Sequence, residues 1–406
     1  MNLLVKKTIF YTCCLCFFLS NSGPVFGARS IRIPFRYVQS FIILEVNLEG
    51  IIPLKLIFDT GAEHHLLFES KYTDIFKDIY SREVKVLGSD LQQEMNAWVT
   101  KPLNLFIEGM GDVSLPLLVL QKPVTGVSEI IGEEIHGILS AAHFKNYFIE
   151  INYSSHIILL HEKLKEEKLK KYESCSMHLY RNKPYITVEM KTQEDNTAVK
   201  LNLLVDTGAG LSLLIYTGHQ TNVTLPAQLV PGKLGSGIGG LINGYVGRTK
   251  SFDFCAFQFP ELLTYFQEQD TELMEREKDR KQGIIGNQIL ERFRVIFDYN
   301  HSVVYFKSIK NYNAQLRFDR SGITCLAGGP LLKNFYVSHL VDNSPAANAG
   351  IKEGDLILKL NSTGAEYLNL NTIQRRLSNK EGKRIRLKVL REGKKLEFTF
   401  TLKDLL

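Results

Sequence analysis

Residues 54–62 read Leu-Lys-Leu-Ile-Phe-Asp-Thr-Gly-Ala, and residues 201–209 repeat the pattern as Leu-Asn-Leu-Leu-Val-Asp-Thr-Gly-Ala. Each Asp-Thr-Gly phrase follows an apolar run and precedes a second apolar pair, which predicts a strand, a tight loop and a strand. The glycine lets the backbone turn sharply just past the carboxylate. Asp59 and Asp206 are therefore both expected at the tips of loops.

The two phrases belong to an internal repeat in which the aspartates are 206 − 59 = 147 residues apart. Leu87-Gly88-Ser89 matches Leu234-Gly235-Ser236 at the same spacing. The segment 136–140 matches the segment 282–286 at a spacing one residue shorter. A repeat of this length indicates a duplicated domain rather than a solenoid unit.

The paired phrases resemble the motifs of aspartic proteases of the retropepsin and pepsin types, in which two similar lobes meet and each supplies one aspartate. The resemblance implies a mainly β, bilobal fold of duplicated β-barrel lobes on one chain. Short runs of Val, Ile, Phe and Tyr divided by Gly and Pro independently favour β structure. The expected divisions are lobe 1 at 31–161, a charged linker at 162–178 and lobe 2 at 179–310.

If the resemblance holds, Asp59 and Asp206 form a catalytic dyad. Two neighbouring carboxyl groups cannot both ionise cheaply, so they share a proton. The charged member takes a proton from a water while the neutral member donates one to the substrate carbonyl. We therefore expect peptide-bond hydrolysis of a polypeptide substrate, without metal or cofactor, by a monomer that carries both aspartates. The residues expected to support the dyad are Thr60, Gly61, Thr207 and Gly208.

Two segments, 87–99 and 234–246, stand at the positions of the flaps, which are hairpins that fold over a bound peptide. Glycine-rich loops move easily and let a backbone approach a substrate, and only the second segment is glycine-rich. We expect the second flap to act on substrate and the first to serve packing; a plain surface loop is the alternative. The expected flap residues are Gly235, Gly237, Gly239, Gly240, Trp98 and Tyr245.

One position departs from the family pattern. Ser140 stands where Gly286 stands in the second half, at the turn expected beneath Asp59. This departure favours an alternative function, a catalytically inactive peptide-binding envelope protein of the same fold. The serine side chain is small, so we expect the turn to tolerate it.

From about residue 316 the pattern changes and resembles an α+β PDZ domain spanning 316–406. A short helix begins with Ser344-Pro345 and ends with Gly350, as expected for helix start and stop signals. The other expected elements are a strand at 334–341, a strand at 354–361, a helix at 370–377 and a hairpin at 385–402. We expect this domain to recruit substrate or to regulate access to the protease.

The expected ligand of the PDZ-like domain is a carboxyl-terminal peptide, added as an extra strand with its carboxylate bound by backbone N–H groups of a loop. The loop 327–332 precedes the strand at 334 and is the candidate, although Pro330 removes one donor. An intramolecular lid is the alternative role. The expected binding residues are Gly328, Gly329, Leu331, Leu332 and Phe335.

Residues 1–27 are typical of a secretory signal peptide, with Lys6 and Lys7 before an apolar run and cleavage after Gly27. The run is shorter than the ~20 residues that a spanning helix needs. An uncleaved anchor and a lipid-modified cysteine rank second and third. We expect a secreted or periplasmic protein, or one associated with the envelope.

Cys175, Cys255 and Cys325 remain beyond that segment. An odd number of widely spaced cysteines forms no disulfide framework and shows no metal-ligand spacing. They are either small buried hydrophobic residues or one disulfide with a remaining thiol. The net charge of +6 is mild and its Lys and Arg are interspersed with Asp and Glu, so nothing suggests nucleic acid as a partner.

Overall fold

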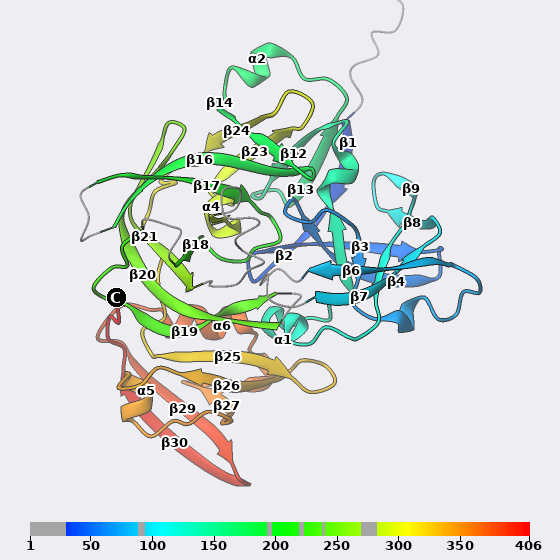
Figure 1. The fold of residues 1–406 in the computed structure, drawn as a ribbon. Helices are drawn as coiled ribbons and strands as arrows, with labels where there is room; N and C mark the ends of the chain where they lie inside the picture. Colours follow the sequence, from blue (N-terminus) through cyan, green and yellow to red (C-terminus); the bar gives the residue numbers. More distant parts are fainter. Residues whose placement is uncertain (1–29, 88–93, 193–196, 219–222, 238–239, 269–281) are drawn as a thin grey trace, which may run out of the picture.

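The computed structural model shows a mainly β protein, with two lobes side by side and a C-terminal unit below them (Figure 1). The expected signal peptide and the tip of the first flap, 88–93, lie outside the described residues. No helix within the described part is long and apolar enough to cross a membrane. The residues that the structure describes are 30–87, 94–192, 197–218, 223–237, 240–268 and 282–406.

Lobe 1 is built on a mixed sheet whose centre holds the first Asp-Thr-Gly loop. There β11 (Gly137–Ser140) lies between β4 (Ile52–Asp59) and β5 (Leu66–Leu67), parallel to β4 and antiparallel to β5. The expected strand, loop and strand around Asp59 are confirmed as β4, a loop and β5. The other strands of the sheet are β2 (Arg36–Val38), β3 (Phe41–Leu48), β6 (Tyr80–Leu87), β7 (Glu94–Thr100), β8 (Leu103–Ile107), β9 (Gly111–Leu115) and β10 (Leu118–Leu120).

Lobe 2 repeats this arrangement in a second sheet. There β22 (Gly283–Ile285) lies between β17 (Val199–Val205) and β18 (Leu213–Thr217), again parallel to the first and antiparallel to the second. The repeat in the sequence is therefore a repeat of strand topology. The remaining strands are β15 (His178–Tyr180), β16 (Lys183–Lys191), β19 (Val230–Gly237), β20 (Gly240–Phe254) and β21 (Phe257–Glu268).

A third sheet joins the two lobes. In it β12 (Phe148–Asn152) of lobe 1 pairs antiparallel with β23 (Phe293–Asp298) of lobe 2. Ile149 and Ile151 on β12 are fully buried, so burial of apolar area holds the lobes together in addition to the strand pairing. The sheet is completed by β1 (Ser30–Pro34), β13 (Ile157–His161), β14 (Glu173–Ser176) and β24 (Val303–Ser308).

The charged linker does more than connect the lobes through solvent, because β14 belongs to this third sheet. Its short helix α2 (Glu166–Leu169) places Lys168 on the buried Glu150, which also contacts His161 Nε2 at 2.8 Å. Burial by itself raises the pKa of Glu150, but the hydrogen bonds from His161 and Lys168 outweigh it and lower the pKa to about 2. The linker is therefore held by a buried ionic cluster.

The cysteines follow the second of the two sequence alternatives. Cys175 on β14 forms a disulfide with Cys255, which lies between β20 and β21. Cys325 is a thiol, and burial raises its pKa. The disulfide therefore ties the linker strand to the hairpin β20–β21 of lobe 2.

The C-terminal unit has its own sheet and its own apolar core, which includes Phe335, Val337 and Leu387. The expected order of strand, helix, strand, helix and hairpin is confirmed. The strands are β25 (Ile323–Gly328), β26 (Asn334–Leu340), β27 (Leu356–Leu360), β28 (Thr363–Gly364), β29 (Arg384–Arg391) and β30 (Lys394–Thr401). The remaining described helices of the chain are α1 (Val127–Ile131), α4 (Asn287–Leu290), α5 (Pro345–Asn348) and α6 (Leu370–Leu377), with short 3-10 turns at Ser70–Tyr72, Ala141–Phe144 and Ala365–Tyr367.

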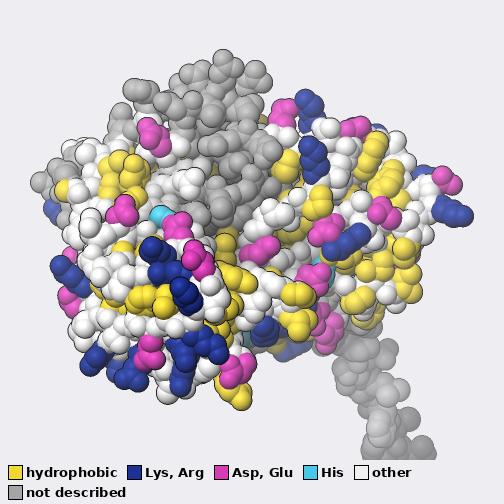
Figure 2. All heavy atoms as spheres, turned by 90° about the horizontal axis from the view of Figure 1, so that it is seen from below, with side chains coloured by type: hydrophobic (Ala, Val, Ile, Leu, Met, Phe, Trp, Pro, Cys, Tyr) yellow, Lys and Arg dark blue, Asp and Glu magenta, His cyan; other side chains and the backbone are white. Residues whose placement is uncertain are grey.

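The charged side chains on the face seen from below are mixed in sign. Figure 2 shows Lys and Arg gathered at one end of this face, with Asp and Glu among them. In the C-terminal sheet, for example, Arg386 on β29 pairs with Glu397 on β30 at 3.4 Å. The positive charge there is partly balanced by neighbouring carboxylates.

Candidate active site

The strands β4 and β17 bring Asp59 and Asp206 to one place between the lobes. An ideal Cβ built on Gly61 would lie 2.6 Å from Asp206 Cγ, and one built on Gly208 would overlap Asp59 Cγ. Each carboxyl group therefore lies against the glycine of the opposing loop. Any side chain at either glycine would displace the opposite carboxyl, so glycine is required here for close approach.

The same glycines orient the carboxyl groups of their own loops. The Gly61 N–H donates a hydrogen bond to Asp59 Oδ1 at 2.6 Å, and the Gly208 N–H donates one to Asp206 Oδ1 at 2.7 Å. These equivalent bonds give the pair an approximate twofold symmetry, as the duplicated sequence predicts.

Thr60 and Thr207 lock the two loops together. The hydroxyl of Thr60 donates to Val205 O at 2.7 Å and accepts the Thr207 N–H at 3.0 Å. The hydroxyl of Thr207 donates to Phe58 O at 2.8 Å and accepts the Thr60 N–H at 3.0 Å. Both side chains are fully buried, so these four bonds have no competition from water.

The electrostatics of the pair are unequal. Asp59 is buried, with 9% of its surface exposed, whereas Asp206 is half-buried. Burial raises the pKa of Asp59 well above its usual value, and the charge of Asp206 and a hydrogen bond with it raise the pKa further. The Gly61 N–H and the charge of Lys183 oppose this shift without cancelling it. This shift favours the protonated form of Asp59.

A polar side chain that the sequence did not single out supports the second loop. Asn287 is fully buried on α4, and its Nδ2 donates to Thr207 O at 2.6 Å and to Ser40 O at 2.8 Å. Its Oδ1 accepts the hydroxyl of Tyr153 at 2.7 Å. Because Ser40 and Tyr153 belong to lobe 1, Asn287 holds the Asp206 loop to the opposite lobe.

The equivalent support is missing beneath the first loop. Ala141 matches Asn287 in the repeat, and Tyr299 matches Tyr153. The buried Tyr299 hydroxyl has no hydrogen-bond partner among the described residues. Burial raises the pKa of Tyr299, as do the charges of Asp59 and Asp206. In the sequence, this difference between the two loops is visible as a mismatch in the repeat, with alanine at 141 and asparagine at 287.

Ser140, the departure from the family pattern, is accommodated. Its hydroxyl donates to Ala62 O at 2.6 Å, and its N–H donates to Nδ1 of the buried His65 at 3.2 Å. Burial, together with the charges of neighbouring histidines, lowers the pKa of His65 to about 4, so the ring is a neutral acceptor. At Gly286, by contrast, an ideal Cβ would meet Ala209 O at 2.8 Å, so only the first loop has room for a side chain.

The expected flap residues lie on two hairpins. Trp98 is on β7, where its ring lies 5.8 Å from that of Tyr80. Tyr245 is on β20, opposite Pro231 of β19, and is 40% exposed. Of the expected glycines, Gly235 and Gly237 lie on β19 and Gly240 on β20, and Gly239 lies outside the described residues.

The residues expected to bind a peptide in the C-terminal unit form a hairpin between β25 and β26. Gly328 pairs with Asn334, and the Leu332 N–H donates to Gly329 O at 3.0 Å, closing a turn. Leu331 is 81% exposed at the tip of this turn. Phe335 is 1% exposed and packs in the core, because alternate residues of β26 face inward. This side chain is therefore not available to a ligand.

The described residues contain no group of three or more His, Cys, Asp and Glu side chains that could hold a metal ion. The polar groups that we assign to the candidate site are the two aspartates with their glycine and threonine partners. Such a pair of carboxyl groups, one protonated and one charged, can act as a general acid and a general base.

Comparison with known proteins identifies a domain family for one part of the chain. A search of curated proteins found none that matches it. A family model of the PDZ domain matches residues 336–391, which run from β26 to the end of β29. The chain therefore carries a PDZ domain at its C-terminal end, a module that binds peptides.

Proposed function

We propose that the chain is an aspartic endopeptidase that hydrolyses peptide bonds with Asp59, Asp206 and one water. The observation that carries the proposal is the pair of crossed Asp-Thr-Gly loops, in which each carboxyl lies against the glycine of the other loop. Burial raises the pKa of Asp59, which supports this residue as the acid of the proposed chemistry. The rival, an inactive peptide-binding protein, loses its main support because Ser140 is accommodated.

In the proposed first step, Asp206 is the base and Asp59 is the acid. The ionised Asp206 takes a proton from the water as its oxygen attacks the carbonyl carbon of the peptide. Asp59 gives its proton to the carbonyl oxygen at the same time, which produces a neutral tetrahedral diol. No bond forms between protein and substrate.

In the second step the roles reverse. Asp206, now protonated, gives its proton to the amide nitrogen, and the carbon–nitrogen bond breaks. Asp59 takes a proton back from one hydroxyl of the diol, which becomes the new carboxyl group. Both carboxyl groups return to their starting states, so the cycle needs only water.

The other parts of the chain have supporting roles in this proposal. The hairpin β19–β20 covers the bound peptide, and the PDZ domain recruits substrate or regulates access to it. The signal-like segment 1–27 directs the protein to the periplasm, the envelope or the medium. An incubation of unstructured peptides with the purified chain, followed by mass spectrometry of the products, tests for hydrolysis directly.

The pH dependence follows from the raised pKa of Asp59. Activity is expected to fall at high pH as Asp59 loses its proton through that raised pKa, and to fall at low pH as the pair gains a second proton. Ala62 and Ala209 offer no hydroxyl to stabilise the charged form, so the optimum should be weakly acidic. The measurement is kcat/KM for an unstructured peptide across the pH range.

Variants make the pH prediction specific. Ala62→Ser and Ala209→Ser each add a hydroxyl next to a carboxyl group, which should move the profile to lower pH. Ala314→Ser, at an exposed position, is the matched control and should leave the profile unchanged. An optimum at strongly acidic pH in the parent, unmoved by either variant, would show that these positions do not control the pair.

Activity per chain is expected to be independent of protein concentration, because one polypeptide supplies both loops. The measurement is specific activity over a dilution series, with the mass of the protein followed by sedimentation. A steep loss of activity on dilution that coincides with dissociation of a dimer would contradict this expectation.

A further inference from the structure

The edge strand of the PDZ sheet, β25, pairs with β26 alone among the strands that the structure describes. Its other edge therefore presents backbone N–H and C=O groups, which are a template for an additional strand. Helix α6 contacts β25 on the same unit. Strand edge and helix together make a place where an extended peptide can be added to the sheet.

A segment of lobe 1 already lies at this place. Helix α1 contacts β25, and Figure 1 shows α1 and α6 on the same side of that strand. Gly132 follows α1 directly, and an ideal Cβ built on it would lie 3.2 Å from Leu370 Cδ1 and 3.9 Å from Ala327 Cβ. Leu370 is the first residue of α6 and Ala327 lies in β25, so the segment 126–132 reaches both the strand and the helix.

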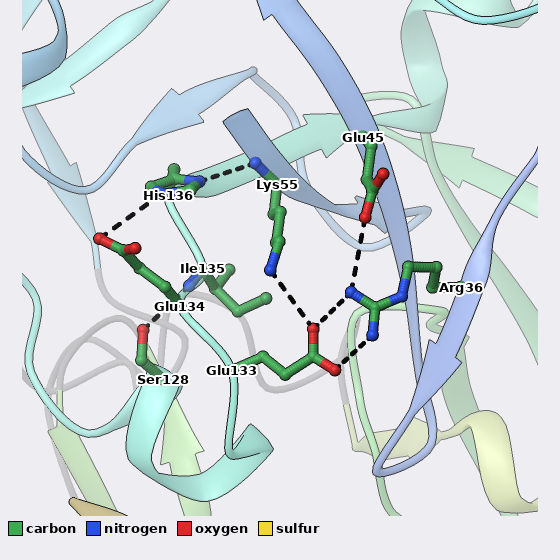
Figure 3. A network of polar contacts seen from close by, with 8 residues as sticks. All are labelled: Arg36, Glu45, Lys55, Ser128, Glu133, Glu134, Ile135 and His136. Carbon is green, nitrogen blue, oxygen red and sulfur yellow. Dashed lines mark hydrogen bonds and ion pairs between the residues drawn. The ribbon is translucent and has the colours of Figure 1, made fainter. Parts of the chain in front are cut away.

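The α1 segment, residues 126–132, is anchored in lobe 1. Val127 and Ile131 are buried in the lobe 1 core. Figure 3 shows how the next turn is held: Arg36 on β2 donates two hydrogen bonds to Glu133, at 2.6 and 2.5 Å, and Lys55 on β4 lies 3.5 Å from the same carboxylate. If a peptide takes the place of α1 on β25, the PDZ domain must therefore move away from lobe 1.

Strand β19, the first strand of the second flap, lies against helix α1 and the PDZ domain. Helix α1 contacts β19, and an ideal Cβ on Gly232 of β19 would lie 3.9 Å from His339 Cδ2 of β26. Just before β19, Gln228 Nε2 donates to Leu405 O at 3.3 Å. Strand β19 is paired with β20 along its length, so movement of the PDZ domain would remove only the contacts that the domain makes at the start of this strand, through His339 and Leu405.

The chemistry at the start of β25 defines the kind of peptide. The N–H groups of Ser321, Gly322 and Ile323 all donate to Asp319 Oδ1, at 2.9, 2.6 and 3.2 Å, and the Ser321 hydroxyl donates to the same carboxylate. A row of backbone N–H groups is what binds the carboxylate of a peptide terminus. Here an internal carboxylate fills it, which leaves the strand edge but no free site for a terminal carboxylate at this end.

We propose that the outer edge of β25 binds an extended internal segment of another polypeptide in place of the α1 segment, and that this exchange removes the contacts of the PDZ domain with the start of strand β19 of the second flap. The proposal goes beyond peptide hydrolysis and does not require it. Binding and backbone exchange, which are measured without turnover, test it separately from the proposed catalysis.

A disulfide between the α1 segment and β25 tests the exchange from one side. The ideal Cβ of Gly132 lies 3.9 Å from Ala327 Cβ, within the roughly 3.5–4.5 Å range of disulfide-bonded residues. The variant is Gly132→Cys with Ala327→Cys, in a Cys325→Ala background that removes the free thiol found among the described residues. The Cys325→Ala chain, oxidised and reduced in parallel, controls for effects on the native disulfide.

A variant that weakens the contact between the α1 segment and α6 provides the opposite test of the exchange. Gly132 has φ +77°, and Gly132→Asn should be tolerated by the backbone but push on Leu370. Gly50→Asn is the matched control, because Gly50 has φ +70° with no atom within 4 Å of its ideal Cβ. Any loss of folding due to the left-handed backbone should appear in both variants.

The ligand probe is a peptide selected on the Gly132→Asn chain from a random library displayed between fixed flanks. It is made with a fluorescein label and an amidated carboxyl terminus. We expect Gly132→Asn to bind it on the order of tenfold more tightly than the parent, Gly50→Asn to bind as the parent does, and the oxidised disulfide form to lose binding until it is reduced. Hydrogen exchange at the amides of Val230 and Gly232 should speed up when the peptide binds the parent.

Three results would overturn the proposal. One is equal binding by the oxidised and reduced forms, and another is a selection that yields no peptide from the folded Gly132→Asn chain. The third is unchanged exchange at the amides of Val230 and Gly232 on binding, which would remove the link to the flap. Much tighter binding of the same peptide with a free carboxyl terminus would show that Asp319 does not fill the terminal site.

Discussion

Asp59→Asn and Asp206→Asn are each expected to lower kcat for peptide hydrolysis by a factor on the order of 10³ or more, because each removes one of the two proton-transfer groups. Asn keeps the size of the side chain and can still accept the Gly61 or Gly208 N–H. The loss should therefore come without unfolding. The measurement is steady-state hydrolysis of an unstructured peptide, with circular dichroism to show the intact fold.

The Asp59→Asn variant also carries a prediction about stability. A carboxyl group whose pKa is raised in the folded state stabilises the protein below its ordinary pKa, and this contribution is lost as the pH rises through the raised pKa. Asn does not titrate, so the variant should gain stability relative to the parent between about pH 4 and about pH 7. Urea unfolding at both pH values measures the difference.

Asp112→Asn is the matched control for both measurements. Asp112 is exposed on β9 and distant in sequence from either loop, so neither activity nor the pH dependence of stability should change. Hydrolysis at the parental rate by either dyad variant would exclude the proposed chemistry. An unstable Asp59→Asn protein at neutral pH would show that the buried carboxylate is paired more favourably than the structure indicates.

Short local patterns in the sequence were sufficient to predict the repeated strand, loop and strand units. The apolar runs on either side of Asp59 and Asp206, with glycine two residues later, define strand, loop and strand without knowledge of the rest of the fold. The helix at 370–377 was predicted with its observed ends, because its start and its apolar spacing are encoded within the segment. Thr60 and Thr207 were expected to support the dyad only through the family resemblance.

The sequence was not sufficient to predict contacts between residues far apart in the chain, particularly contacts that are present in only one half of the repeat. Asn287 supports the Asp206 loop through Ser40 and Tyr153, and nothing near it in the sequence indicates these partners. The loop expected to receive a peptide terminus is a hairpin turn, whereas the row of N–H groups lies at Ser321–Ile323 and is filled by Asp319. Such pairings depend on how sheets pack, which short patterns do not specify.

Thr60→Val and Thr207→Val are each expected to lower the free energy of unfolding by about 2–6 kcal/mol. Valine keeps the shape of threonine but leaves one N–H of the opposing threonine and one carbonyl oxygen buried without a partner, at about 1–3 kcal/mol for each group. Activity should fall as well, because the loops no longer hold the two carboxyl groups in register. Urea unfolding and kcat/KM measure the two effects.

Thr249→Val is the control, since Thr249 is also fully buried but its hydroxyl makes only long contacts, 3.3 Å to Leu262 O and 3.4 Å to Thr264 Oγ1. It should cost clearly less stability. In the double variant the costs should not add, because each hydroxyl bonds the N–H of the other threonine and the first substitution already weakens the second set of bonds. Additive losses equal to that of Thr249→Val would mean that the crossed bonds are formed but contribute little, and that the dyad is held instead by Asn287 and the sheet that joins the lobes.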